Sequence, residues 1–229
     1  MIPSPPIAVF DLDGTLAHTA PDLIATLNVI LDAEGVPRLP VEQASELIGA
    51  GARALIERGL QATGREVAPA RMEVLYRKFL VHYGENLCVD TTLFPGVVAA
   101  LDRLEEAGFR LAVCTNKIEA HSVRLLRALG IAERFAAICG RDSFPYCKPD
   151  PRHLTLTIEQ AGGDPAQAVM IGDSRTDVAT AKAARIPMVA VSFGYTEIAP
   201  RELGADRLVD HFDEMFAAVR DCIAVSEPA

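Results

Sequence analysis

The chain has 229 residues, of which 50% are hydrophobic and 23% charged, and its 22 Lys and Arg against 31 Asp and Glu give a formal net charge of −9. A chain of this length and hydrophobic content can bury a large core, which argues against extended disorder. The net negative charge argues against nucleic acids and anionic membranes as partners, because both bind basic surfaces. We therefore expect a small partner, or one that binds locally.

The N-terminal residues show no targeting signal. They contain no basic segment, and the apolar run 7–10 is too short for a signal peptide or a membrane span, so we expect a cytoplasmic protein. The five cysteines are widely spaced and form no Cys-x-x-Cys pair, which favours free thiols in a reducing compartment. The five histidines are equally dispersed, so no structural zinc site is expected.

Six short apolar segments have the composition of buried strands and alternate with helical patterns. This alternation is typical of an open, Rossmann-like α/β fold, in which helices cover both faces of a parallel sheet. Glycines at 108 and 130 follow two of the helical patterns and mark where those helices end. The predicted strands are residues 7–11, 110–114, 135–139, 168–171, 188–191 and 207–209.

The segment 17–89 interrupts this alternation. Its apolar residues repeat at helical spacing, as Leu23, Leu27 and Ile30 do, and no strand pattern stands between its helices. The turn Phe94-Pro95-Gly96 then returns the chain to the sheet. We predict an α/β core of residues 1–16 and 90–229 with an inserted α-helical cap domain of residues 17–89.

Carboxylates follow two of the predicted strands. Asp11 and Asp13 stand in the sequence DLDGT at the end of the first strand, where alternate residues face the same side. Asp173 and Asp177 stand in GDSRTD, directly after the strand 168–171. Because carboxyl ends of parallel strands bind ligands and Mg²⁺ prefers oxygen ligands, the two clusters together indicate a metal site. Taken singly, a solvated turn and an N-cap at Asp173 or Ser174 are the alternatives.

Two further loops carry groups that suit an anion. Thr115 and Asn116 follow the strand 110–114 and offer a hydroxyl and backbone N–H groups at a helix start, where the helix dipole favours negative charge. Lys148 is a cation in the sequence CKPDP, where Pro149 disfavours helix. Taken alone, an ordinary helix cap and a solvated lysine are the alternatives.

These four elements, in this order, resemble the haloacid dehalogenase superfamily of phosphohydrolases over nearly the whole chain. The sequences TNK at 115–117, KPDP at 148–151, GDSR at 172–175 and FGY at 193–195 are most similar to the phosphoglycolate phosphatases. The resemblance implies a phosphatase that converts 2-phosphoglycolate to glycolate and phosphate. A sugar-phosphate phosphatase or a phosphomutase is the alternative within the superfamily. A receiver-type signalling domain is the non-enzymatic alternative, but the helical insertion makes the chain too long for one.

The resemblance also implies the reaction. Asp11 would be the nucleophile that forms an aspartyl-phosphate, and Asp13 would protonate the leaving group and then activate the hydrolytic water. Dehalogenases, whose halide leaving group needs no proton, generally lack a carboxylate at the second of these positions. The presence of Asp13 therefore favours phosphate esters.

The remaining residues would hold the phosphate and the metal ion. The groups expected at the phosphate are the side chains of Thr115 and Lys148 and the backbone N–H groups of Leu12 and Asn116. The expected Mg²⁺ ligands are Asp11, Asp173 and the backbone carbonyl of Asp13, with Ser174 and Asp177 supporting them.

The helical insertion would close over the site, exclude water and select the leaving group. Within it, Arg53 in the sequence GAGAR would bind a substrate carboxylate, or else be a surface arginine after a helix–helix turn. The expected partner is a small phosphorylated metabolite, without nucleic acid or membrane, and the expected state is a monomer or homodimer. Arg185 stands where helices often end in a left-handed glycine; because that geometry costs an arginine roughly 1 kcal/mol, we expect a different ending.

Overall fold

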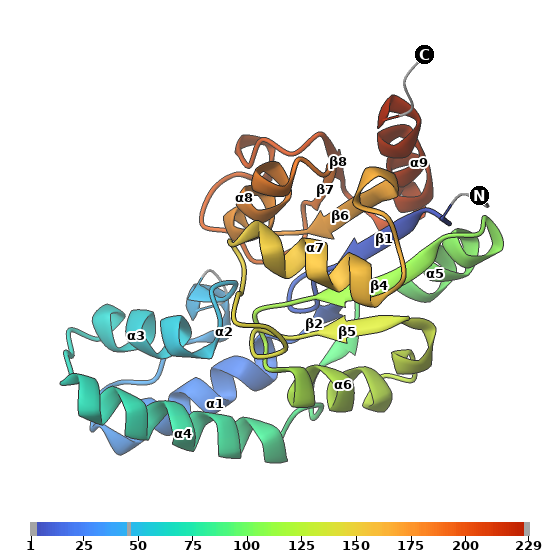
Figure 1. The fold of residues 1–229 in the computed structure, drawn as a ribbon. Coiled ribbons are helices and arrows are strands. Elements are labelled where there is room, and N and C mark those ends of the chain that lie inside the picture. The colour runs from blue at the N-terminus through green and yellow to red at the C-terminus, as the bar shows by residue number, and fades with distance from the viewer. Residues whose placement is uncertain (1–3, 45–46, 227–229) are drawn as a thin grey trace.

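The computed structural model describes residues 4–44 and 47–226, so the outermost residues of the predicted core, 1–3 and 227–229, lie outside the described part. One sheet has the strand order β5-β4-β1-β6-β7-β8, and every neighbouring pair is parallel (Figure 1). Its strands are β1 (Ile7–Phe10), β4 (Arg110–Cys114), β5 (Ala137–Cys139), β6 (Ala168–Gly172), β7 (Met188–Val191) and β8 (Arg207–Val209). Each lies within two residues of a predicted strand, and the predicted α/β class is confirmed.

Alternate residues of the strands serve two separate cores, one on each face of the sheet. In β1, Ala8 and Phe10 face the first core and Ile7 and Val9 the second, and all four are fully buried. The first core is covered by α5 (Val97–Glu106), α6 (Glu119–Ala128) and α9 (Met215–Ser226), and the second by α7 (Pro151–Gln160) and α8 (Arg175–Ala184). Burial on both faces explains why the strands read as continuous apolar runs.

The insertion forms a separate helical unit, which comprises α1 (Ala20–Ala33), α2 (Val41–Ala44), α3 (Ala52–Ala62) and α4 (Pro69–Glu85). Its apolar residues pack against one another rather than against the sheet; Leu27, Leu60 and Phe79 are in this third core. Figure 1 shows the unit projecting from one end of the sheet, away from both chain termini. The helical spacing of the apolar residues thus produces a unit with its own core.

Two connections join the helical unit to the sheet. The two-residue strands β2 (Ala17–His18) and β3 (Thr92–Leu93) pair antiparallel at this junction, and they are too short to give a sequence pattern. The buried carboxylate of Asp22 accepts hydrogen bonds from the backbone N–H groups of residues 89–91, each at 3.0 Å, and from the hydroxyl of Thr91 at 2.7 Å. The start of α1 therefore holds the returning connection in place.

The end of α8 corrects one expectation. Arg185 does adopt the left-handed conformation, with φ 58° and ψ 37°. The N–H of Arg185 donates to the carbonyl of Lys182, and that of Ile186 donates to the carbonyl of Ala181. These bonds and the burial of Ile186 complete the cap, so the chain retains the strained arginine at the end of the helix.

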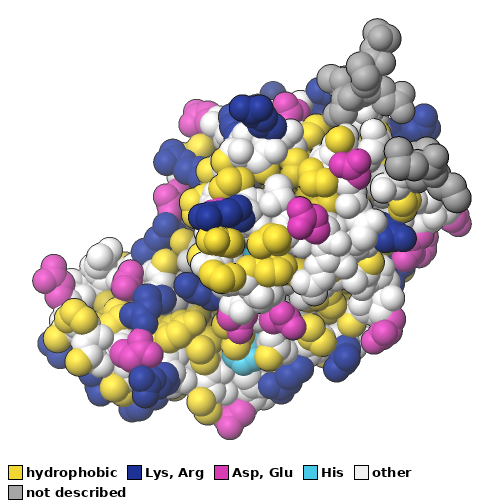
Figure 2. Space-filling view, in the orientation of Figure 1, with side chains coloured by type: hydrophobic (Ala, Val, Ile, Leu, Met, Phe, Trp, Pro, Cys, Tyr) yellow, Lys and Arg dark blue, Asp and Glu magenta, His cyan; other side chains and the backbone are white. Residues whose placement is uncertain are grey.

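Charged groups of both signs are interspersed over the face of the molecule seen in Figure 2. On that face the charged side chains are thus distributed rather than gathered into one patch of a single sign. In the described ranges, no helix combines the length and the apolar character needed to cross a membrane.

Candidate active site

The predicted site residues meet at the carboxyl end of the central strands. Strands β4 and β5 lie on one side of β1, and strands β6 to β8 lie on the other side. The strand order therefore reverses at β1. Such a reversal leaves a crevice where open α/β sheets bind ligands. Asp11, Thr115, Lys148 and Asp173 are all at least 95% buried there.

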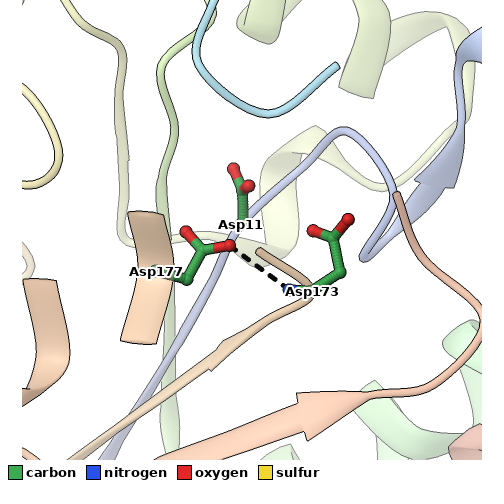
Figure 3. A group of neighbouring side chains, drawn as sticks. All are labelled: Asp11, Asp173 and Asp177. Carbon is green, nitrogen blue, oxygen red and sulfur yellow. Dashed lines mark hydrogen bonds between the residues drawn. The ribbon is translucent and has the colours of Figure 1, made fainter. Parts of the chain in front are cut away.

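Three carboxylates lie together at this edge. Asp11 follows β1, Asp173 follows β6 and Asp177 lies in the first turn of α8, and ligand oxygens of the three lie within 4.8 Å of one another (Figure 3). Burial, together with the neighbouring carboxylates, raises the pKa of Asp11 to about 6 despite the opposing effect of Lys148. Burial and the charges of Asp177 and Asp11 also raise the pKa of Asp173 well above its usual value. Buried oxygens with this excess of negative charge fit a hard divalent cation such as Mg²⁺.

Asp177 organises the cluster. One of its oxygens accepts from Lys148 Nζ at 2.6 Å, and the other accepts from Ser174 Oγ at 2.6 Å and from the N–H groups of Asp173 and Ser174. Ser174 in turn caps α8 by accepting from the N–H of Asp177. Capping and site assembly are thus achieved by the same two side chains, although the sequence presented them as alternatives.

Lys148 lies between two carboxylates. Its Nζ is 2.9 Å from Asp11 Oδ1 as well as 2.6 Å from Asp177 Oδ1. Burial alone would lower the pKa of Lys148, but the attraction of Asp11 and Asp177 outweighs burial and raises it. The ammonium group therefore stays charged beside Asp11.

The second oxygen of Asp11 is open. Asp11 Oδ1 forms the ion pair with Lys148 and accepts from the N–H of Leu12 at 2.7 Å, whereas Oδ2 has no hydrogen-bond partner among the described residues. The Leu12 N–H, expected at the phosphate, is thus engaged by Asp11. Asn116 donates to the carbonyl of Lys148 at 3.1 Å, and its buried Oδ1 has no partner in the described chain.

Asp173 is fixed from two sides. Its carboxylate accepts from Thr15 Oγ1 at 2.9 Å and from the N–H of Tyr195 at 2.6 Å. A Cβ on Gly194 would lie 2.1 Å from the Cβ of Asp173, so only glycine permits this approach. The Tyr195 hydroxyl accepts from the N–H of Ala20 at 2.9 Å, and its ring packs in the core of the helical unit. The FGY sequence thereby connects Asp173 to the start of α1.

Asp13 lies outside the acidic cluster. Its carboxylate is paired with Lys117, whose Nζ is 2.7 and 2.9 Å from the two oxygens. The buried ammonium of Lys117 also lies 4.5 Å from the ring centroid of Tyr83 in α4. Lys117 stands in the sequence TNK, but no local pattern indicates its pairing with Asp13, because the two residues are 104 positions apart. A metal contact from the Asp13 carbonyl remains a prediction.

A cavity lies between this edge of the sheet and the helical unit. Its walls combine polar groups of the core with apolar side chains of α3 and α4. The lining includes Asp11, Asp13, Thr115, Asn116, Lys117 and Arg141 from the core and Gly49, Gly51, Leu55, Phe79 and Tyr83 from the helical unit.

The loop before α3 closes one side of the cavity. At Gly51, where φ is +88°, an added Cβ would lie 3.0 Å from Arg141 Nη1 and 3.2 Å from the carbonyl oxygen of Asn116. Arg53 points elsewhere: it pairs with Glu73 and lies over the ring of Tyr76. Arg53 is not among the described residues that line the cavity, so the structure does not bring it to this site, and its contact with a substrate carboxylate stays a prediction. The arginine in the cavity wall is Arg141.

Comparison of the sequence with known proteins finds close relatives that are phosphatases. The chain is 49% identical over 212 residues to the phosphoglycolate phosphatase of Mesorhizobium japonicum (strain LMG 29417 / CECT 9101 / MAFF 303099), covering 93% of each chain. It is 44% identical over 203 residues to that of Caulobacter vibrioides (strain ATCC 19089 / CIP 103742 / CB 15), covering 89% of this chain and 86% of the relative.

Solved structures share this fold. The crystal structure of a predicted phosphoglycolate phosphatase from Haemophilus somnus 129pt has a TM-score of 0.86 at 31% identity, covering 95% of this chain and 99% of that chain. CbbY from Rhodobacter sphaeroides in complex with phosphate has a TM-score of 0.78 at 28% identity, covering 94% and 99%. These relatives confirm the predicted superfamily and its phosphatase class. Residues 8–191 match the haloacid dehalogenase-like hydrolases, and the chain belongs to that family.

Proposed function

We propose that this chain is a Mg²⁺-dependent phosphomonoester hydrolase that acts through an aspartyl-phosphate on 2-phosphoglycolate. The observation that carries the proposal is the open oxygen of Asp11, whose carboxylate pairs with Lys148 and clusters with Asp173 at the reversal of strand order. The relatives described above support the choice of phosphoglycolate. Two of them are phosphoglycolate phosphatases, and this chain matches 93% and 86% of their lengths.

In the first step, Asp11 Oδ2 attacks phosphorus in line and the bond from phosphorus to the leaving oxygen breaks, which leaves an aspartyl-phosphate. Lys148 stabilises charge on Asp11 and on the phosphoryl oxygens, and Thr115 with the N–H of Asn116 holds the phosphate from the facing loop. Mg²⁺, held by Asp11, Asp173 and the carbonyl of Asp13, would neutralise charge between the carboxylate and the phosphate.

Asp13 carries the proton in both steps. It gives a proton to the departing alkoxide, then takes one from the water that cleaves the aspartyl-phosphate. In the structure its carboxylate is held by Lys117, at the wall shared with α4. Release from Lys117 when substrate enters would place the carboxyl group at the leaving oxygen.

The helical unit excludes water from these steps. We assign residues 17–89 to a cap domain and residues 1–16 and 90–229 to the core, because the unit has its own apolar cluster and two connections to the sheet. The loop at Gly51 already contacts Asn116 and Arg141, so a small displacement of the unit opens or closes the cavity.

The test is Mg²⁺-dependent phosphate release from 2-phosphoglycolate, sugar phosphates and nucleotides. Wild-type protein should turn over 2-phosphoglycolate best and should be trapped as a ³²P-labelled protein by acid quench. Asp11→Asn should abolish both signals, while Asp32→Asn, a surface carboxylate, should leave both unchanged.

Three outcomes would contradict the proposal. Wild-type turnover by Asp11→Asn would exclude the covalent step. Retention of phosphate on an isomeric product would indicate a phosphomutase. Faster release from a sugar phosphate would favour that substrate class.

A further inference from the structure

The cations around the cavity differ in whether they already have a partner. Lys117 is paired with Asp13, and Lys148 is paired with Asp11 and Asp177. The guanidinium of Arg141 makes no hydrogen bond or ion pair with any residue in the described ranges. Among the described residues, Arg141 is therefore the cation of this wall that has no anionic partner.

The position of Arg141 places this charge next to the candidate phosphate site. The backbone N–H of Arg141 donates to the carbonyl of Lys117 at 3.0 Å, so its loop runs beside the segment that carries Thr115 and Asn116. A Cβ added at Gly51 would lie 3.0 Å from Nη1 of Arg141, so the guanidinium is packed closely against the loop before α3. The guanidinium thus lies where the helical unit meets the core, in the wall of the cavity that Thr115 and Asn116 also line.

The rest of this wall limits what can bind there. Leu55 and Phe79 present apolar surface, and the nearby His121 is neutral at pH 7 because burial and the charge of Lys117 lower its pKa to about 4. One cation among apolar side chains and a neutral histidine would recognise a leaving group that carries a single anionic group. A planar carboxylate matches the fork of a guanidinium, which can donate two parallel hydrogen bonds to it.

We propose that Arg141 is a specificity-determining residue that binds the carboxylate of the leaving group and so selects carboxylated phosphomonoesters. This inference rests on the proposed function and extends it to the choice of substrate. Arg53, the arginine that the sequence favoured for this role, is the matched control, because it stands close to Gly51 in sequence but is paired with Glu73.

The experiment compares 2-phosphoglycolate with 2-hydroxyethyl phosphate, in which a hydroxymethyl group replaces the carboxylate. Arg141→Ala should lower kcat/KM for 2-phosphoglycolate by roughly 10- to 100-fold, the range for a lost hydrogen bond to a charged group, and change that for 2-hydroxyethyl phosphate less than about 3-fold. Arg141→Lys should restore part of the loss. Arg53→Ala should change neither substrate by more than about 2-fold.

Charge reversal gives a second measurement. Arg141→Glu should reverse the preference, so that 2-aminoethyl phosphate becomes a better substrate than 2-phosphoglycolate. Circular dichroism confirms that each variant is folded, and turnover of 2-hydroxyethyl phosphate confirms that its catalytic groups are intact.

The outcomes separate the two proposals. Wild-type protein that does not prefer 2-phosphoglycolate to 2-hydroxyethyl phosphate would overturn the proposed substrate. Wild-type protein with that preference, together with an Arg141→Ala variant that keeps it, would overturn the role of Arg141 alone. A selective loss with Arg53→Ala would assign the carboxylate site to the helical unit instead.

Discussion

The two sides of the cavity are built by different means. On the core side, Lys148, Asp173 and Asp177 are buried and joined by hydrogen bonds and ion pairs of 2.6 to 3.2 Å. On the side of the helical unit, apolar residues such as Leu55 and Phe79 form the wall and little is polar. The difference teaches that hydrogen bonds and ion pairs fix the core side of the cavity, whereas the opposite wall is formed by apolar packing.

Removing Lys148, the central cation on the core side of the cavity, should have the largest effect. Lys148→Ala leaves Asp11 and Asp177 buried without their partner, which should reduce the free energy of unfolding by about 3–5 kcal/mol. Turnover should fall by roughly 10²- to 10³-fold, as for loss of one preorganised group at the reacting centre. Urea unfolding and steady-state kinetics measure both, with the exposed Lys78→Ala as control. A stable, active Lys148→Ala variant would show that the ion pairs are dispensable.

The pH dependence of stability tests how firmly the core side is packed. His153 is fully buried; its Nε2 lies 3.0 Å from the carbonyl of Gly140, and its Nδ1 accepts from the N–H of Lys148. Burial and the charge of Lys148 lower the pKa of His153 to about 4. The unfolded chain, with a histidine pKa near 6.5, binds the proton first as pH falls, so stability is lost between about pH 6.5 and 4.

This histidine should contribute up to about 3 kcal/mol to the loss over that range. Chemical unfolding of wild type and His153→Gln at a series of pH values measures it as the difference between their two profiles. Profiles with identical slopes between pH 6.5 and 4 would show that His153 is not the group responsible.

The attachment of the helical unit can be weakened without touching the core network. Asp22→Ala removes the acceptor for the N–H groups of residues 89–91, and it leaves the N–H and hydroxyl of the buried Thr91 without this partner. We expect a loss of about 2–3 kcal/mol and faster hydrogen exchange at these amides. Asp32→Ala, on the same helix but exposed, should change stability by less than about 1 kcal/mol. Unchanged exchange at 89–91 would contradict the role assigned to Asp22.

A site outside both regions should show the smallest effect. Arg185→Gly relieves the left-handed strain at the end of α8 and should raise the free energy of unfolding by roughly 1 kcal/mol without changing turnover. Ala179→Gly, at an exposed position inside the helix, should lower it by a similar amount. Thermal unfolding distinguishes the two, and a destabilised Arg185→Gly variant would mean that the arginine side chain stabilises this turn.

The two sides also differ in how far sequence could predict them. Asp11, Thr115 and Asp173 follow strands whose apolar runs are long enough to recognise, so their meeting at one edge follows from parallel topology. The contacts of Arg53 and Arg141 depend on how the helical unit docks on the core, which no local pattern encodes. The pair β2 and β3 is too short to leave a period, and the left-handed Arg185 is held by tertiary burial of Ile186.

Tyr195 connects the core side of the cavity to the helical unit. Its backbone N–H holds Asp173, while its hydroxyl accepts from the first residue of α1 and lies 2.9 Å from His18 Nδ1. Any displacement of the helical unit is therefore applied, through one rigid aromatic residue, to a carboxylate of the acidic cluster. By reciprocity, whatever binds at Asp173 biases the position of the unit as strongly as the unit biases binding. Binding at Asp173 and closure of the helical unit over the cavity would then belong to one equilibrium.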